Sequence, residues 1–437
     1  MKKTGLIERD IYLNKLIDFK DTEPVKVITG IRRCGKSSLL KLMQNHLLDH
    51  GVKDEQIISI NFESLKFQDL TYKELYEYVS KRIIANKKCY LFFDELQRID
   101  KWENAINSFR VDFDCDIYIT GSNSYLLSSE YATYLSGRYV EIKMYPLSFK
   151  EFIDFQGYKI EGYKLPDNTQ KIRAINKEGD IVELNDLFKL YVRYGGMPGI
   201  SIAGLEQDRV MTLMDGIYST VIVRDILDRK KRRYEKQIND SELLRKIILF
   251  LADNIGNNTS LNSISNTLTS EKIIQNIKKK EKPANQTISS YISALKESYM
   301  FYEVKRFDIK GKEYLKTLEK YYIVDIGLRN FLLGFRDIDR GHVLENIVYF
   351  ELLRRGFDVA IGKIDNLEVD FIATKANEKI YLQITESMKN EVVRERELRP
   401  LKKIKNNYRK IVITMEKTIG DEYEGIEVIE LIDWLLI

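Results

Sequence analysis

Apolar residues in the first 150 positions follow two different spacings. Short, continuous runs rich in Val, Ile and Phe predict buried strands, and the stretches between them carry apolar residues every three or four positions, as in amphipathic helices. The strand-like runs are residues 25–29, 57–62, 89–93, 117–120 and 139–144. This alternation of strands and helices indicates an α/β fold for residues 1–150.

Helical spacing dominates from residue 150 to residue 335. A polar stretch at 157–182 interrupts it and indicates an irregular insertion. The part from 239 to 335 predicts helices and then two strand-like runs, namely helices at 243–254, 261–268 and 287–301 and strands at 300–307 and 320–324. Three helices followed by a β-hairpin are the parts of a winged helix-turn-helix.

The last hundred residues mix both spacings again. A helix is predicted at 342–355, and strands are predicted at 367–372, 380–385 and 410–415. Residues 336–437 are therefore expected to form a second α/β unit.

Length, charge and cysteine content narrow the class of protein. A chain of 437 residues is expected to hold two to four domains, and its net charge of +4 neither requires nor excludes a nucleic-acid partner. Cys34, Cys89 and Cys115 form no CxxC pair, which argues against a zinc site or a disulfide framework and favours a reducing cytoplasm. Charges interrupt every long apolar stretch, so no membrane-spanning helix is expected.

The sequence GIRRCGKS, between the first strand and the helix after it, carries the clearest chemical signal. Glycine at both ends lets backbone N–H groups approach phosphate oxygens, and the N-terminus of the following helix favours the same anion. In this GxxxxGK[ST] spacing, Lys36 is expected to reach the β- and γ-phosphates of ATP, and Ser37 to be a ligand of Mg²⁺. The predicted nucleotide-binding residues are Gly30, Ile31, Arg32, Arg33, Cys34, Gly35, Lys36, Ser37 and Ser38.

Two carboxylates follow the strand at 89–93. Asp94 is expected at the sheet edge beside Mg²⁺, and Glu95 is placed to polarise the water that attacks the γ-phosphate. An apolar run followed by Asp-Glu also describes an ordinary strand and turn. Its position after a complete phosphate-binding loop favours the catalytic interpretation.

Three further residues are candidates for contact with the γ-phosphate. Ser122 and Asn123 follow the strand at 117–120 and could sense the phosphate by hydrogen bonding, although an exposed turn is the alternative. Arg138 could act as a catalytic arginine finger or as an intramolecular γ-phosphate contact, and a surface arginine at a turn is its alternative.

Five segments together resemble the AAA-type ATPases of prokaryotes that carry a second, C-terminal domain. They are GIRRCGKSSLL, YLFFDELQRIDKWENAI, YITGSNSYLL, LSGRYVEIKMYPLSFKEF and YVRYGGMPGI, in that order. The resemblance spans essentially the whole chain and implies a parallel αβα sheet, in which one strand separates the P-loop strand from the Mg²⁺ strand, and a helical lid over residues 151–238. It also favours functional roles for Ser122 or Asn123 and for Arg138, which would act between subunits only if the protein forms a ring.

Double-stranded DNA and a protein both remain open as partners. The basic run at 229–233 could neutralise phosphates, although such runs are more often solvated helix ends. In a winged helix, the third helix would enter the major groove while Lys310 and Lys312 meet phosphates. Winged helices also dock proteins.

Residues 336–437 resemble the restriction-endonuclease-like fold, in which acids hold a metal and a lysine orients the attacking water. The corresponding positions are Glu345, Glu368, Asp370 and Gln383. Thr385 stands where the lysine is expected, so this position has no cation to position the nucleophile. The resemblance implies a degenerate nuclease-like domain that has lost cleavage.

The motifs predict Mg²⁺-dependent ATP binding and hydrolysis, coupled to repositioning of C-terminal DNA- or protein-binding modules. A nucleotide-gated switch with little turnover and an ATP-driven DNA nuclease are the alternatives. The expected domains are a P-loop ATPase core at 1–150, a helical lid at 151–238, a winged helix at 239–335 and the degenerate nuclease-like domain at 336–437.

Overall fold

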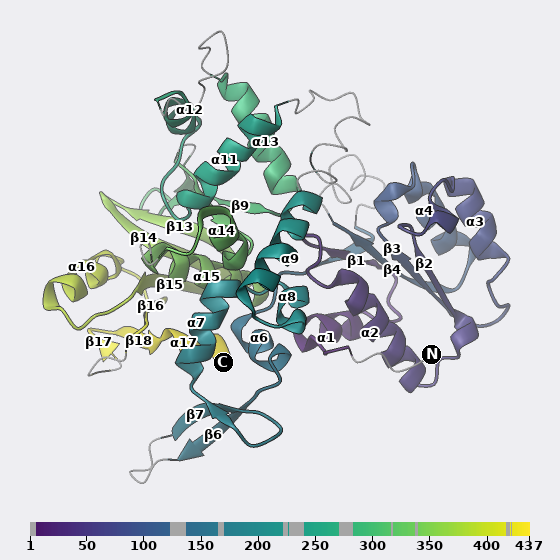
Figure 1. Ribbon diagram of the computed structural model, residues 1–437, viewed down its shortest axis with the longest axis horizontal. Helices are drawn as coiled ribbons and strands as arrows, with labels where there is room; N and C mark the ends of the chain where they lie inside the picture. The colour runs from purple at the N-terminus through teal and green to yellow at the C-terminus, as the bar shows by residue number, and fades with distance from the viewer. Residues whose placement is uncertain are drawn as a thin grey trace. The chain divides into compact units, whose positions relative to one another are not determined.

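The protein forms two compact units in the computed structural model, which describes residues 6–122, 137–164, 170–221, 226, 240–270, 283–315, 318–336, 340–416, 420 and 422–437 (Figure 1). The N-terminal unit comprises Met1–Tyr145 with Glu297–Tyr299, and the C-terminal unit comprises Pro146–Lys296 with Met300–Ile437. The boundaries predicted inside the C-terminal unit stay predictions.

A parallel sheet, five-stranded over the described residues, is the centre of the N-terminal unit, with the order β2-β3-β4-β1-β5. The strands are β1 Val25–Thr29, β2 Ile57–Asn61, β3 Cys89–Asp94, β4 Cys115–Gly121 and β5 Tyr139–Lys143. The predicted α/β fold is confirmed. Strand β4 separates β1 from β3, as the resemblance implied.

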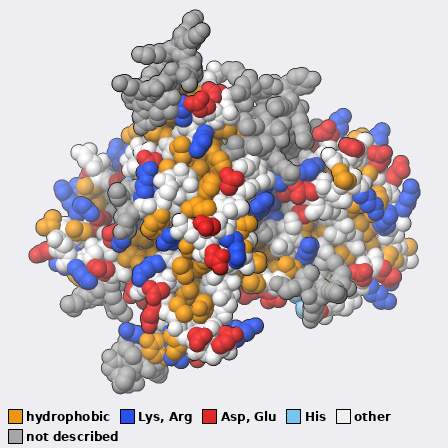
Figure 2. Space-filling view, in the orientation of Figure 1, with side chains coloured by type: hydrophobic (Ala, Val, Ile, Leu, Met, Phe, Trp, Pro, Cys, Tyr) orange, Lys and Arg blue, Asp and Glu red, His pale blue; other side chains and the backbone are white. Residues whose placement is uncertain are grey.

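Helices cover both faces of this sheet (Figure 1). They are α1 Asp10–Asp18, α2 Lys36–Asp49, α3 Tyr72–Ser80 and α4 Trp102–Asp112. Helices α3 and α4 pack Leu75 and Phe109 against the face that holds Val27 and Phe93, while α1 and α2 lie together on the other side. Because both faces are buried, the strands are continuously apolar. Figure 2 shows acidic and basic side chains interspersed over the visible surface, in keeping with the small net charge.

A mixed sheet, eight-stranded within the described part of the chain, organises the C-terminal unit, with the order β11-β10-β13-β14-β15-β16-β18-β17. Its strands are β10 Arg306–Asp308, β11 Glu313–Tyr314, β13 Asp358–Ile364, β14 Leu367–Lys375, β15 Glu378–Thr385, β16 Arg409–Thr414, β17 Glu422–Tyr423 and β18 Ile426–Glu430. The strands predicted at 367–372, 380–385 and 410–415 correspond to β14, β15 and β16.

The predicted hairpin of 300–307 and 320–324 differs from the structure. Strands β9 Phe301–Val304 and β12 Lys320–Ile323 pair as a separate antiparallel sheet. The residues directly after β9 leave that pair and continue as β10, which lies parallel to β13. Backbone hydrogen bonds from Ile361 to Lys305 and from Ile309 to Lys363 hold it there.

The prediction of an irregular insertion at 157–182 is wrong. Strands β6 Lys159–Lys164, β7 Gln170–Ile175 and β8 Ile181–Val182 form an antiparallel sheet, three-stranded among the described residues. The stretch is largely exposed, yet it includes the fully buried Ala174. A small sheet with little apolar area is polar enough to resemble a loop in sequence.

Helices make up most of the rest of the C-terminal unit. They are α6 Phe149–Phe155, α7 Leu184–Tyr194, α8 Pro198–Ala203, α9 Gln207–Thr220, α11 Ser241–Asp253, α12 Leu261–Ser270, α13 Asn285–Glu297, α14 Ile326–Leu333, α15 Arg340–Arg354, α16 Glu391–Lys402 and α17 Leu431–Leu436. The basic run at 229–233 lies outside the described residues. In the part of the chain that the structure describes, none of the helices has the length and apolar character needed to cross a membrane.

Candidate functional site

The glycine-rich loop joins the carboxyl end of β1 to α2. A Cβ atom on Gly30, whose φ is +146°, would lie 2.1 Å from the carbonyl oxygen of Met144, so only glycine fits there. Gly35 begins α2 in the left-handed conformation, with φ 107°, and has no side chain that could cap the helix. The N-terminal N–H groups of α2 therefore suit an anion.

Lys36 and Arg9 fix the shape of this loop. The buried Lys36 ammonium donates hydrogen bonds to the carbonyl oxygens of Gly30 and Ile31, at 2.9 and 3.1 Å. The Arg9 guanidinium, also buried, donates to the carbonyl oxygens of Cys34 and Tyr145, at 2.9 and 3.0 Å. Lys36 thus lies along the loop that its charge would serve, and Arg9 supports that loop from behind.

Asp94, at the end of β3, lies in a polar network with the start of α2. Its carboxylate accepts hydrogen bonds from the Thr120 hydroxyl at 2.6 Å and the Asn61 amide at 2.9 Å, and it is hydrogen-bonded to the Ser37 side chain. Burial raises the pKa of Asp94 more than these hydrogen bonds lower it. A cation beside Asp94 would oppose that increase, so the pair Ser37 and Asp94 fits the predicted Mg²⁺ ligands.

Glu95 follows in a left-handed backbone conformation with φ 58°. Its carboxylate accepts hydrogen bonds from the Ser122 hydroxyl at 3.0 Å and from the Gln97 amide. Burial raises the pKa of Glu95, but the charges of Lys36 and Arg32 and the hydrogen bonds from Gln97 and Ser122 together outweigh burial, and the net pKa lies below the usual value. Glu95 is therefore ionised at neutral pH, as a general base must be.

Of the three remaining predicted residues, Ser122 lies at the site, Arg138 lies away from it, and Asn123 is not described. Ser122 is fully buried beside Glu95, whereas Asn123 lies outside the described residues. Arg138 is exposed, and its backbone oxygen accepts from Val25 at the amino end of β1. Because β1 is five residues long, this edge is about 13 Å from the glycine-rich loop. The structure does not bring Arg138 to the loop of its own subunit, and action between subunits stays a prediction.

Four residues of this network were not predicted from the sequence: Arg9, Asn61, Gln97 and Thr120. Asn61 and Thr120 stand at or near the carboxyl ends of strands that flank β3. Polar residues ending parallel strands were a usable signal, since such strand ends meet at one edge. Arg9 gave no such signal because it precedes a separate helix.

The loop, the Asp94–Glu95 pair and the strand order define a P-loop ATPase domain of the AAA type. Residues 22–153 match the family model described as an AAA domain, and residues 185–339 match a domain of unknown function, DUF8612. The chain belongs to the same family as an uncharacterized protein of Haemophilus influenzae. The two are 40% identical over 434 residues, which cover 99% of each chain. The uncharacterized protein MJ1544 of Methanocaldococcus jannaschii is 31% identical, and the match covers 100% of this chain and 92% of that one.

Two solved structures show weaker similarity. The Walker-type ATPase PABY2304 of Pyrococcus abyssi has 16% identity and a TM-score of 0.49, and the match covers 74% of this chain and 95% of that one. Cdc6p of Pyrobaculum aerophilum has 12% identity and a TM-score of 0.29, with coverage of 80% and 96%. The family models name neither a winged helix nor a restriction-endonuclease-like domain, so both stay proposals.

The positions predicted for a degenerate nuclease site surround a groove of about 760 Å³ in the C-terminal unit. They are Glu345, Glu368, Asp370 and Gln383. The Asp370 carboxylate accepts hydrogen bonds from the backbone N–H of Ile384 at 2.8 Å and the Gln383 amide at 3.3 Å. Burial and the nearby Glu345 raise the pKa of Asp370 well above its usual value. Among the described residues, no group of three or more His, Cys, Asp or Glu is placed to hold a metal ion.

A lysine that was not predicted from the sequence lies among these acids. The Lys320 ammonium, from β12, is 2.7 Å from a Glu368 oxygen and 3.5 Å from a Glu345 oxygen, and its side chain is only 4% exposed. Burial lowers the pKa of Lys320, but Glu345 and Glu368 outweigh burial and raise it. Burial raises the pKa of Glu345, but Lys320, together with His342 and the Tyr322 hydroxyl, outweighs burial and lowers it. Lys320 is thus the internal counter-ion of the cluster.

Replacing Lys320 by Met is expected to lower the free energy of unfolding of the C-terminal unit by roughly 3–5 kcal/mol, because Glu345 would stay buried without its cation. Urea titration followed by circular dichroism measures the loss. Adding Glu345→Gln should restore part of the stability. Lys171→Met, at an exposed position on β7, is the control and should change little. An unchanged unfolding midpoint in Lys320→Met would contradict the role of Lys320 as counter-ion.

Proposed function

We propose that this protein is a Mg²⁺-dependent ATPase whose nucleotide state repositions C-terminal binding modules. The observation that carries the proposal is the arrangement of Asp94 and Glu95 beside the glycine-rich loop, linked to Ser37 and Ser122 by hydrogen bonds. Measurement of Mg²⁺-dependent phosphate release by the Glu95→Gln and Lys36→Ala proteins tests the proposal, and we expect both to lose this activity. Unchanged hydrolysis in both would reject it.

In this proposal, each residue of the site has a separate task. The N–H groups of the loop and the Lys36 ammonium bind the phosphates, and Ser37 and Asp94 hold Mg²⁺. When bound, the ion neutralises charge on the β- and γ-phosphates. Glu95 takes the proton of the attacking water, and Ser122 orients the Glu95 carboxylate by its hydrogen bond.

A nucleotide-gated switch with little turnover is the second candidate. Its support is the contact of Glu95 Oε2 with two donors, Ser122 and Gln97, which restrain the carboxylate that would accept the proton. Slow release of Glu95 from these donors would then limit turnover both with and without a partner. Steady-state phosphate release measured with and without duplex DNA separates the candidates, because a switch stays slow in both conditions.

The C-terminal unit serves in this proposal as a binding module built on a winged helix and a restriction-endonuclease-like domain. Its partner is double-stranded DNA or a protein. We assign the activity to the reducing cytoplasm on the evidence of the free Cys34, Cys89 and Cys115.

This proposal assigns no DNA cleavage to the C-terminal unit. Thr385 supplies no cation for cleavage, and Lys320 already neutralises Glu345 and Glu368, so a metal ion would have to compete with Lys320 for these carboxylates.

Incubation of the protein with supercoiled plasmid and Mg²⁺ or Mn²⁺ is therefore expected to leave the DNA intact. The Asp370→Ala protein should behave identically, because the Asp370 carboxylate already accepts hydrogen bonds from Ile384 and Gln383. Agarose gel electrophoresis with and without ATP measures the outcome. Cleavage by the wild-type protein that disappears in Asp370→Ala would instead establish the ATP-driven nuclease.

A further inference from the structure

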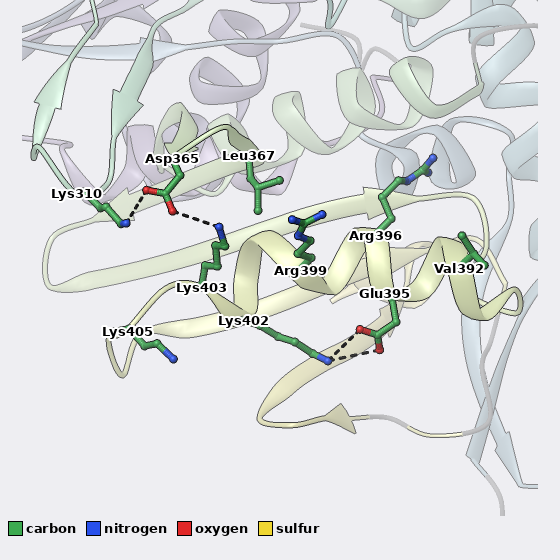
Figure 3. Close-up of a pocket in the computed structure, with 10 residues that line it drawn as sticks. All are labelled: Lys310, Asp365, Leu367, Val392, Glu395, Arg396, Arg399, Lys402, Lys403 and Lys405. Atoms are coloured by element: carbon green, nitrogen blue, oxygen red, sulfur yellow. Dashed lines mark hydrogen bonds and ion pairs between the residues drawn. The ribbon is translucent and has the colours of Figure 1, made fainter.

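A second groove, of about 750 Å³, borders α16 in the C-terminal unit (Figure 3). We call it the α16 groove. Its basic lining residues are Lys310, Arg396, Arg399, Lys402, Lys403 and Lys405. Two acidic residues, Asp365 and Glu395, also line it, and Glu397 and Glu424, outside the lining, pair with Arg396 and Lys402, so six cations minus four carboxylates leave about +2. The whole chain has a net charge of +4, so this groove concentrates positive charge on an otherwise balanced surface.

Three of the basic residues form a stripe along one face of α16. Arg396, Arg399 and Lys403 are separated by three and four positions, which places them on the same side of a helix. Figure 3 shows them following one another along the helix, with Lys310 across the groove from Lys403. At 1.5 Å per residue the stripe is roughly 10 Å long.

The acidic residues neutralise only part of this charge. Asp365 pairs with Lys310 at 2.5 Å and with Lys403 at 3.3 Å, so one carboxylate serves two lysines. Arg399 and Lys405 are exposed, and neither pairs with a carboxylate among the described residues. Surplus positive charge therefore remains at two positions in the groove.

Stabilisation of α16 does not account for this arrangement. Cations in the last turn of a helix interact favourably with its dipole, which accounts for Arg399 and Lys402. The same effect does not explain Arg396, in the first half of α16, or Lys310, which follows β10 in a different part of the chain. Convergence of cations from separate segments indicates a site for an extended anion.

The occupant that fits this surface is a nucleic-acid duplex. A stripe roughly 10 Å long that lies along a duplex spans about three base-pair steps, at 3.4 Å of helix axis per phosphate of each strand. Of the described residues that line the groove, none is aromatic, so a single strand would find no side chain on which to stack its bases. Val392 is a single exposed apolar residue, too little for insertion into a membrane.

The neighbouring acidic groove is compatible with this occupant. Arg396 and Leu367 line both grooves, so a duplex on α16 would approach Glu368 and Asp370. Lys320 neutralises part of that cluster, which lowers the repulsion of phosphates.

We propose that the α16 groove binds the phosphate backbone of a nucleic-acid duplex without reading its sequence. This rests on the proposed role of the C-terminal unit as the binding module of the ATPase, and it names the partner of that module. Contacts to phosphates position a duplex and carry no base information, so affinity depends on salt and not on sequence.

The test is fluorescence anisotropy of the full-length protein with fluorescein-labelled DNA duplexes of different sequence, between about 50 and 200 mM salt. The double variant Arg399→Glu/Lys405→Glu is expected to bind at least about tenfold more weakly, with a salt slope smaller by about 1.8, or about 0.9 for each lost phosphate contact. The control, Lys171→Glu/Lys177→Glu, reverses two exposed charges on and beside β7 of the same unit and should bind like the wild type.

Two further measurements separate the outcomes. ATP turnover and the thermal unfolding midpoint should be unchanged in the Arg399→Glu/Lys405→Glu protein, so that loss of DNA binding with normal hydrolysis supports the α16 groove alone. An RNA duplex of the same sequence shows which duplex is preferred. Equal duplex binding by this variant and the wild type, tighter binding of a single strand, or no binding of either duplex by a wild-type protein that hydrolyses ATP would overturn the proposal.

Discussion

Glu95→Gln is expected to lower the rate of ATP hydrolysis by about 10²- to 10⁴-fold while leaving ATP binding intact. The amide has nearly the same shape and can still accept the hydrogen bond from Ser122, but it cannot take a proton from water. Steady-state phosphate release measures the rate, and titration with a fluorescent ATP analogue measures binding. Glu103→Gln, the same change at a buried position of α4, is the control and should hydrolyse ATP normally.

The pH profile gives a second criterion for Glu95. The charges of Lys36 and Arg32, together with two hydrogen bonds, outweigh burial and hold the pKa of this carboxyl below its usual value. The active, ionised form therefore persists to lower pH than for an ordinary glutamate. Turnover should therefore fall on the acid side only below the usual glutamate range. Hydrolysis by Glu95→Gln at the wild-type rate would rule out Glu95 as the base.

Lys36→Ala is expected to weaken ATP binding by roughly 10²-fold or more. The buried ammonium can donate at least two hydrogen bonds to anionic oxygens, and each contributes about 1.5–3 kcal/mol. Isothermal titration calorimetry with ATP and Mg²⁺ measures the change. Lys41→Ala, on the exposed face of the same helix, is the matched control and should bind ATP as the wild type does.

A folded Lys36→Ala protein with unchanged affinity would show that the loop is not the phosphate site. Loss of its two contacts to the Gly30 and Ile31 carbonyls also removes a support of the loop itself. Thermal unfolding of the nucleotide-free protein should therefore accompany the binding measurement. A small shift in the midpoint, together with a large loss of affinity, identifies a binding role.

Local patterns were sufficient to predict the α/β fold of the N-terminal unit, whereas the contact of Ser122 with Glu95 was not predicted. The GxxxxGKS motif and the strand ending in Asp94 are each contained in a few consecutive residues. Thr120 and Asn61 needed the strand order, because their contacts with Asp94 cross between neighbouring strands. Strand order was available only through resemblance to a family.

Whether a predicted site residue reaches the glycine-rich loop also depends on the end of its strand at which it stands. Arg138 precedes β5, and the residue before a parallel strand lies at the opposite edge from the residue that follows one. Lys320 could not be assigned from sequence, because its strand pairs only with β9 among the described residues and reaches Glu345 through tertiary packing. The resemblance implied a cation at position 385, whereas the cation in the structure, Lys320, stands 65 positions earlier in the chain.

The path of β10 has a mechanical consequence for any movement driven by ATP. This strand comes from the segment predicted as a winged helix, yet it is hydrogen-bonded to β13 of the eight-stranded sheet. The helices that precede β10 and the eight-stranded sheet are therefore expected to move as one rigid body, because bending between them would break the backbone hydrogen bonds between β10 and β13. A fragment that begins at residue 336 would keep β13 but lack β10. The edge of β13 would then be exposed and open to pairing with other molecules.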